Sequence, residues 1–238
     1  MELGKRIQII GMPRSGTTYI TNLIYSHFLT HKFNVDLAGE PPNNSKNARI
    51  HYINDMLEKP QEHIMKLMTT DINSTINEID YKKYRDKFYS IGILRKNLFN
   101  ATVSYALGSQ TQEFDNYTYD DTLRVEISVK NFIGRLREQL YAYESYQTLK
   151  ALNYFNHELI YEDLTFIPVV DLYNIPHFKN RVSLLDQEHT SSTTRAPGKF
   201  KIITNTEELR EVYKKYVQSP KRIKDIELEP NLFNIKLR

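Results

Sequence analysis

Residues 7–18 read Ile7-Gln-Ile-Ile-Gly-Met-Pro-Arg-Ser-Gly-Thr-Thr18 and predict a strand, a tight loop and a helix in succession. The first four residues favour a β-strand, and Gly11, Pro13 and Gly16 are typical of a turn. Apolar side chains then recur at helical spacing, at Tyr19, Ile20, Leu23, Ile24 and Phe28. A strand that leads through such a loop into a helix points several backbone N–H groups at one place, at the positive end of the helix dipole. The stretch therefore predicts a phosphate-binding loop.

Outward from this loop, predicted strands and helices alternate along the chain. Phe88–Leu94 and Glu158–Tyr161 are apolar runs of the kind found in buried strands, whereas the pattern of His63–Met68 is ambiguous between strand and helix. The alternation predicts an α/β fold of the P-loop type, with a mainly parallel β-sheet flanked by helices. We expect one domain over residues 1–238 with a mobile loop at 186–199. Helices are expected in a segment that Pro60 ends, after Leu94 to about Leu107, along Val129–Tyr143, from Glu162-Asp163 onward, and near 206–218.

The composition excludes several classes of function. The 238 residues contain no cysteine, which excludes disulfides, thiolate zinc sites and cysteine nucleophiles. A net charge of +3 is too small to argue for bulk binding of nucleic acid. The longest apolar runs are only a few residues, so we expect no membrane span, and the first residues do not have the pattern of a signal peptide. The sequence thus predicts a cytoplasmic protein.

The residues inside the loop limit the kinds of phosphate ligand that it is expected to bind. Nucleotide triphosphatases share the frame G-x-x-x-x-G but continue with Lys and then Ser or Thr. Here Thr17 and Thr18 follow Gly16, and a cation, Arg14, lies inside the loop instead. This arrangement suits one phosphate beside one other charged group better than a magnesium-bound triphosphate. The alternative interpretation is an ordinary glycine turn ahead of a helix.

Two motifs resemble one family. Pro13-Arg-Ser-Gly-Thr-Thr18 looks like the 5′-phosphosulfate loop of sulfotransferases that use 3′-phosphoadenylyl sulfate. The family's second signature, a basic residue about eight positions before a serine, is matched by Arg95 and Lys96 ahead of Ser104, and it leaves open which of the two cations binds the 3′-phosphate. Weaker similarities lie in Leu159–Leu164 and Lys201–Leu209.

The resemblance implies transfer of a sulfuryl group to a hydroxyl or amine of an acceptor, which we expect to be a carbohydrate, a lipid or another small molecule. Adenosine 3′,5′-bisphosphate would be released, and the scheme requires no metal. Glu40 is the expected base, Lys66 the expected contact to the sulfuryl group, and Arg14 the charge that stabilises the leaving phosphate. The alternative for Glu40 is an ordinary solvated loop acid. The implied donor-binding residues are Arg14, Ser15, Gly16, Thr17, Thr18, Arg95, Lys96, Ser104 and Arg195.

Two other functions stay open at this point. A P-loop nucleotide kinase or hydrolase would need a magnesium-binding acid, for which Asp171, after two valines, is the candidate. A non-catalytic nucleotide-binding module would keep the loop without a working base. Replacement of Glu40 distinguishes such a module from an enzyme.

Overall fold

The computed structural model describes residues 6–30, 35–41, 45–75, 78–112, 122–178 and 199–218. The chain divides into two compact units, which we call the sheet unit (Met1–Asn97 and Tyr141–Arg195) and the helical unit (Leu98–Leu140 and Ala196–Arg238). The loop predicted at 186–199 lies outside the described residues, apart from the backbone of Lys199.

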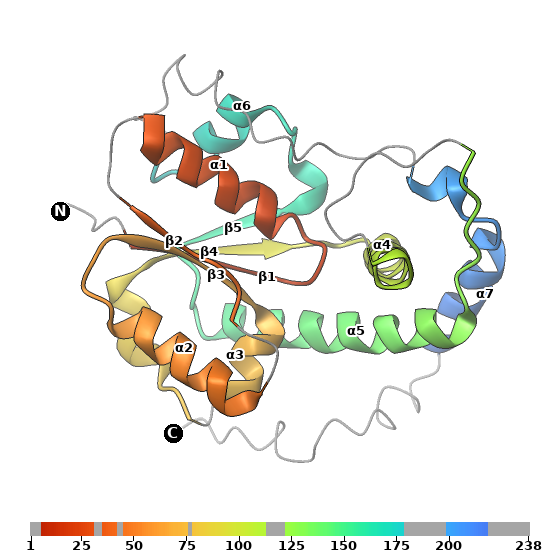
Figure 1. The fold of residues 1–238 in the computed structure, drawn as a ribbon, viewed down its shortest axis with the longest axis horizontal. Helices are drawn as coiled ribbons and strands as arrows, with labels where there is room; N and C mark the ends of the chain where they lie inside the picture. The colour runs from red at the N-terminus through yellow and green to blue at the C-terminus, as the bar shows by residue number, and fades with distance from the viewer. Residues whose placement is uncertain are drawn as a thin grey trace. The chain divides into compact units, whose positions relative to one another are not determined.

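A five-stranded, all-parallel sheet forms the centre of the sheet unit, with the strand order β2-β3-β1-β4-β5 (Figure 1). It confirms the predicted α/β fold with a parallel sheet. Because all strands run the same way, their carboxyl ends meet at one edge, where ligands bind in open α/β sheets. The strands are β1 (Ile7–Gly11), β2 (Asp36–Ala38), β3 (His63–Met68), β4 (Tyr89–Leu94) and β5 (His157–Ile160).

Helices cover both faces of this sheet. Alternate side chains of β1 point to opposite faces of the sheet. Ile7 and Ile9 pack with α1 on one face, whereas Ile10 packs with α2 on the other. One face carries α1 (Thr17–Thr30) and α6 (Pro168–Tyr173). The other carries α2 (Lys46–Glu58), α3 (Thr69–Thr75), the 3₁₀ helix Tyr81–Lys87 and the second half of α5 (Val129–Ala151).

The strand order creates a switch point between β1 and β4. From β1 the chain crosses to β2 on one side of the sheet, whereas from β4 it leads to β5 on the other side. The two connections diverge above the carboxyl ends of neighbouring strands, and such a divergence leaves a crevice that ligands occupy in this class of fold. The loop at 12–16 follows β1, and Arg95 follows β4, so both lie at this point.

The helical unit has its own apolar core. It contains α4 (Leu98–Thr111), the first half of α5, the 3₁₀ helix Lys199–Ile202 and α7 (Thr206–Val217). Phe132 and Leu136 of α5 pack with Leu209 of α7, and a parallel bridge joins Val125 to Ile203. The helices expected here from apolar spacing are confirmed. Among the described residues, no helix has the length and apolar character needed to span a bilayer.

Two local features differ from the sequence predictions. The strand β2 was not predicted, because its three residues are too few to show a period and its Asp36 and Leu37 are exposed. Glu162 and Asp163 do not open an α-helix: they lie in a short 3₁₀ helix, Tyr161–Asp163, and α6 begins only at Pro168.

Candidate functional site

The loop after β1 has two residues with left-handed backbone. Arg14 has a φ of 64° and Gly16 a φ of 85°. Ser15 lies between them, fully buried, and its side chain and its N–H both bond the carbonyl of Met12, at 2.7 and 3.2 Å. The first helical bond of α1 runs from Ile20 N–H to the Gly16 carbonyl, so the amides just before it lie at the N-terminal end of the helix. This backbone is shaped to receive an anion.

Glycine is required at the start of this loop by close packing. A Cβ added to Gly11 would lie 2.5 Å from Cγ2 of Thr17, 2.6 Å from Oγ of Ser15 and 3.0 Å from the carbonyl oxygen of Ile93 on β4. The loop therefore folds back tightly on the end of its own strand and against the neighbouring strand.

Arg95 holds the loop from the other side of the switch point. Its Nη1 donates a 2.8 Å hydrogen bond to the carbonyl of Arg14, and its guanidinium lies over the ring of Tyr161, 4.3 Å from the centroid. Only 8% of Arg95 is exposed, and the bond to the carbonyl and the ring contact offset part of the cost of burying its charge. Left-handed backbone costs a non-glycine residue roughly 1–2 kcal/mol. A hydrogen bond from a charged donor contributes about 1.5–3 kcal/mol, which is enough to hold Arg14 in this conformation.

The residue after Tyr161 fixes the start of the segment that follows β4. The two carboxylate oxygens of Glu162 accept hydrogen bonds from the N–H groups of Lys96 and Asn97, at 3.0 and 2.9 Å. Tyr161 and Glu162 follow β5 in the chain. Together they stabilise the loop after β1, through Arg95, and the segment that follows β4, through its amides. We call Arg14, Arg95, Tyr161 and Glu162 the Arg95 cluster.

Three predicted residues meet on the opposite side of the loop. Nζ of Lys66 donates a 3.0 Å hydrogen bond to Oγ1 of Thr18 and lies 2.8 Å from Oε1 of Glu40. Lys66 points to the α1 face because its neighbours on β3, Met65 and Leu67, are buried on the other face. We call Thr18, Glu40 and Lys66 the Lys66 cluster.

Strand β2 is what brings Glu40 to this place. It pairs with β3 so that Ala38 lies opposite Met65, and Glu40 follows two residues later. The hydroxyl of Tyr52 on α2 donates a 3.0 Å hydrogen bond to the carbonyl of Gly39 and so holds the residue between β2 and Glu40 in place. The side chain of Lys66 is 14% exposed and that of Glu40 is 41% exposed, so the carboxylate lies at the solvent side of the pair.

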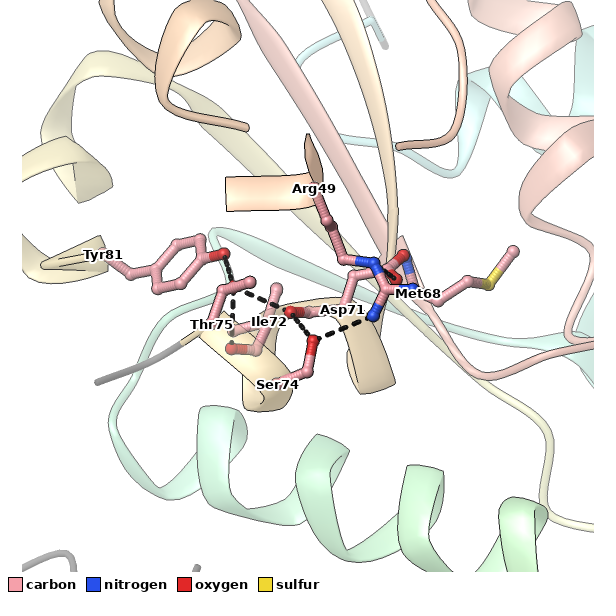
Figure 2. Close-up of polar contacts among 7 residues, drawn as sticks. All are labelled: Arg49, Met68, Asp71, Ile72, Ser74, Thr75 and Tyr81. Carbon is pink, nitrogen blue, oxygen red and sulfur yellow. Dashed lines mark hydrogen bonds and ion pairs between the residues drawn. The ribbon is translucent and has the colours of Figure 1, made fainter. Parts of the chain in front are cut away.

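A second polar group, which the sequence analysis missed, lies where β3 ends (Figure 2). Asp71 of α3 accepts a 3.1 Å bond from the N–H of Met68, and Nε of Arg49 on α2 lies 3.4 Å from its other oxygen. Arg49 also donates to Oγ of Ser74 at 3.1 Å. Burial raises the pKa of Asp71, an effect that Glu40 reinforces and that the Met68 N–H and Arg49 only partly offset. An acidic residue three positions after the residue that precedes the helix, Met68, was the available signal.

Asp171, the magnesium-binding candidate of the kinase alternative, is engaged in packing. It accepts hydrogen bonds from the Tyr19 hydroxyl at 2.8 Å, from the N–H and hydroxyl of Thr165, each at 2.9 Å, and from the N–H of Phe166 at 2.9 Å. Burial, together with the bond to Asp171, raises the pKa of Tyr19. Asp171 therefore joins α1 to the turn before α6, which is a structural role.

The other predicted site residues lie in three different places. The side chain of Lys96 is exposed beside the Arg95 cluster. Ser104 is buried in α4 of the helical unit, and its role in the same site as the loop stays a prediction. Arg195 lies outside the described residues. Tyr146 and Tyr154 are buried, which suits packing rather than an open acceptor site.

Comparison of the chain with protein-family models and with curated proteins finds no match. The geometry of the loop and of the two clusters beside it is therefore the basis for any assignment of function.

Proposed function

We propose that the chain is a sulfotransferase that takes its sulfuryl group from 3′-phosphoadenylyl sulfate. The observation that carries the proposal is the double contact of Lys66 with Thr18, at the start of α1, and with Glu40. It places a cation and a carboxylate beside the helix end that suits the donor phosphate. A sulfuryl transfer needs both of these groups, one toward the sulfuryl oxygens and one toward the acceptor.

The roles follow from the positions of these groups. The 5′-phosphate is bound by the N–H groups of Gly16, Thr17 and Thr18 with the charge of Arg14, where negative charge grows on the bridging oxygen. Lys66 turns from Glu40 to the sulfuryl oxygens when the donor is bound, which leaves the Glu40 carboxylate able to accept a proton.

In the proposed transfer, the acceptor hydroxyl gives its proton to Glu40 while its oxygen forms a bond to sulfur. The bond between sulfur and the bridging oxygen breaks, and its electron pair stays on the phosphate of the released adenosine 3′,5′-bisphosphate. The exposed side of Glu40 faces solvent, from which an acceptor can enter. A carbohydrate, a lipid or another small molecule fits the same donor site as acceptor, and the donor contacts of Ser104 and Arg195 rest on the family resemblance alone.

Calorimetric titration with adenosine 3′,5′-bisphosphate tests the proposal, with adenosine 5′-monophosphate and magnesium-ATP as comparison ligands. We expect micromolar binding that weakens at least about tenfold, or roughly 1.4 kcal/mol, when the 3′-phosphate is missing. Tighter binding of magnesium-ATP would replace the proposal with the kinase or hydrolase alternative. Equal affinity for the bisphosphate and the monophosphate would remove the reason to assign this donor.

A further inference from the structure

We propose that Arg95 is a positioning residue that keeps the phosphate-binding loop in its anion-receiving shape, and that it does not bind the nucleotide itself. The inference rests on the proposed function only in the choice of nucleotide. The resemblance to sulfotransferases left open whether Arg95 or Lys96 binds the 3′-phosphate, with Arg95 slightly favoured, whereas the two residues make different contacts in the sheet unit.

One hydrogen bond of Arg95 is directed at the loop. Nη1 of Arg95 bonds the carbonyl of Arg14, which is the one non-glycine residue of the loop with left-handed backbone. The carbonyl direction depends on the φ and ψ angles around it, so a bond to that oxygen selects the conformation in which it is formed. Arg95 thus acts on the backbone that presents the amides, one step away from the ligand.

Tyr161 extends the same support to the second left-handed residue. Its ring lies under the guanidinium of Arg95, and a Cβ added to Gly16 would lie 3.0 Å from Cδ2 of that ring. One aromatic ring therefore lies in contact range of both Gly16 and the guanidinium of Arg95. The ring also contacts Phe166, with centroids 5.7 Å apart, which anchors it in the apolar layer of α1 and α6.

Lys96 differs from Arg95 in the exposure of its side chain and in its contacts. Its backbone N–H is bonded by Glu162, while its side chain is exposed. Replacement of Lys96 removes the same charge from the adjacent position without touching the loop, so it is the matched control for Arg95.

The first test needs no ligand: hydrogen exchange of the peptide that covers the loop, relative to a peptide from β4. In Arg95→Gln we expect the loop amides to exchange about tenfold faster, because the loop loses a bond from a charged donor. Lys96→Gln and Tyr161→Phe should exchange at the wild-type rate, whereas Tyr161→Leu should behave as Arg95→Gln does. Loop exchange at the wild-type rate in Arg95→Gln would overturn the proposal.

The second test uses adenosine 3′,5′-bisphosphate and adenosine 5′-monophosphate as probes. Arg95→Gln should weaken both by the same factor, about tenfold, because the damaged loop serves the 5′-phosphate that both share. A loss confined to the bisphosphate would mean that Arg95 binds the 3′-phosphate directly and would overturn the positioning role. Arg95→Lys, which keeps the charge and a single donor but not the planar contact with Tyr161, should lie between the wild type and Arg95→Gln.

The two proposals fail in different ways. If the wild type binds neither nucleotide, the sulfotransferase proposal fails, and the loop exchange rates still decide the role of Arg95. Thermal unfolding of each variant shows whether it is folded. If Arg95→Gln does not fold, the comparison of Tyr161→Leu with Tyr161→Phe and the rates of Arg95→Lys decide the same question.

Discussion

The two sides of the loop are built from different kinds of contact. In the Lys66 cluster, side chains contact side chains, and the ion pair between Lys66 and Glu40 is partly exposed. In the Arg95 cluster, hydrogen bonds join side chains to backbone groups, at the carbonyl of Arg14 and the amides after β4, and the ring contact between Arg95 and Tyr161 is added to them. Contacts between side chains can exchange partners without moving the chain, whereas contacts to backbone hold its shape. We propose that the two sides have different roles, with the transfer reaction on the Lys66 side and the shape of the loop maintained from the Arg95 side.

The largest effect is expected from Glu40→Gln, on the Lys66 side. The amide keeps the size of the side chain but cannot accept the acceptor's proton, so the rate of sulfuryl transfer should fall by a factor of about 100 or more. Binding of adenosine 3′,5′-bisphosphate and the melting temperature should change little, because a partly exposed ion pair contributes little to stability. Transfer assays with labelled donor, run beside calorimetry, check this separation.

The result for Glu40→Gln also tests whether the Lys66 cluster and the Arg95 cluster have different roles. An unchanged transfer rate in Glu40→Gln would remove Glu40 as the base. Loss of donor binding in the same variant would show that the Lys66 side holds the shape of the loop as well.

The next largest effect is expected from Gly16→Ala, on the Arg95 side. Alanine at a φ of 85° is strained by roughly 1–2 kcal/mol, and its Cβ would meet the ring of Tyr161 at 3.0 Å. We expect the free energy of unfolding, measured in urea, to fall by about 2 kcal/mol, together with a loss of nucleotide binding. Gly39→Ala, beside the other cluster, is the control, because no described atom lies within 4 Å of the added carbon. A similar loss at both glycines would contradict the contrast.

A smaller effect is expected from Glu162→Ala. The variant leaves the N–H groups of Lys96 and Asn97 without their carboxylate partner, much as the loss of a helix cap does. Such losses cost about 1 kcal/mol of unfolding free energy. Asp163→Ala changes the neighbouring acidic residue of the same short helix and should leave stability unchanged. Chemical denaturation of the two variants side by side distinguishes a specific role of Glu162 from a general effect of charge.

The smallest effect concerns pH and strand β3, which carries Lys66. Burial, with added repulsion from Arg6 and Lys59, lowers the pKa of His63 at the start of this strand below its ordinary 6.5. The folded protein therefore binds this proton less tightly than the unfolded chain does, and stability present near neutral pH is lost as the pH falls through 6.5 toward the lowered pKa. Urea unfolding at about pH 7 and about pH 5 should show a smaller decrease in His63→Gln than in the wild type. Burial also lowers the pKa of His157, which gives both proteins a common background of the same sign.

The parts of the site that depend on local sequence were predictable, and those that depend on strand pairing were not. Gly11, Gly16 and the apolar spacing of α1 identify the loop because each acts within a few residues of its own position. The meeting of Lys66 with Glu40 depends on β2, which is too short to show a pattern and takes its place only by pairing with β3.

Arg95 shows the same limit from another side. Its position after a buried strand was visible in the sequence, but a cation there is equally suited to a phosphate or to a backbone carbonyl. The left-handed backbone of Arg14 and the ring of Tyr161 distinguish the two, and both are properties of the folded chain. Asp71 was missed because its neighbours on α2 are distant in sequence.

The ammonium group of Lys66 also closes a chain segment. Thr18 lies at the start of α1 and Glu40 lies two residues after β2, so a single side chain of β3 joins the two ends of a segment that includes β2. Joining the ends removes part of the entropy that the segment would gain on opening, a term that grows only slowly with length. Strand β2 is short and lies at the edge of the sheet, so it belongs to the elements that open first in a folded protein. When Lys66 leaves Glu40 for another anion, the ion pair that joins the two ends of the segment is lost. Strand β2 should then open more often than the other strands of the sheet.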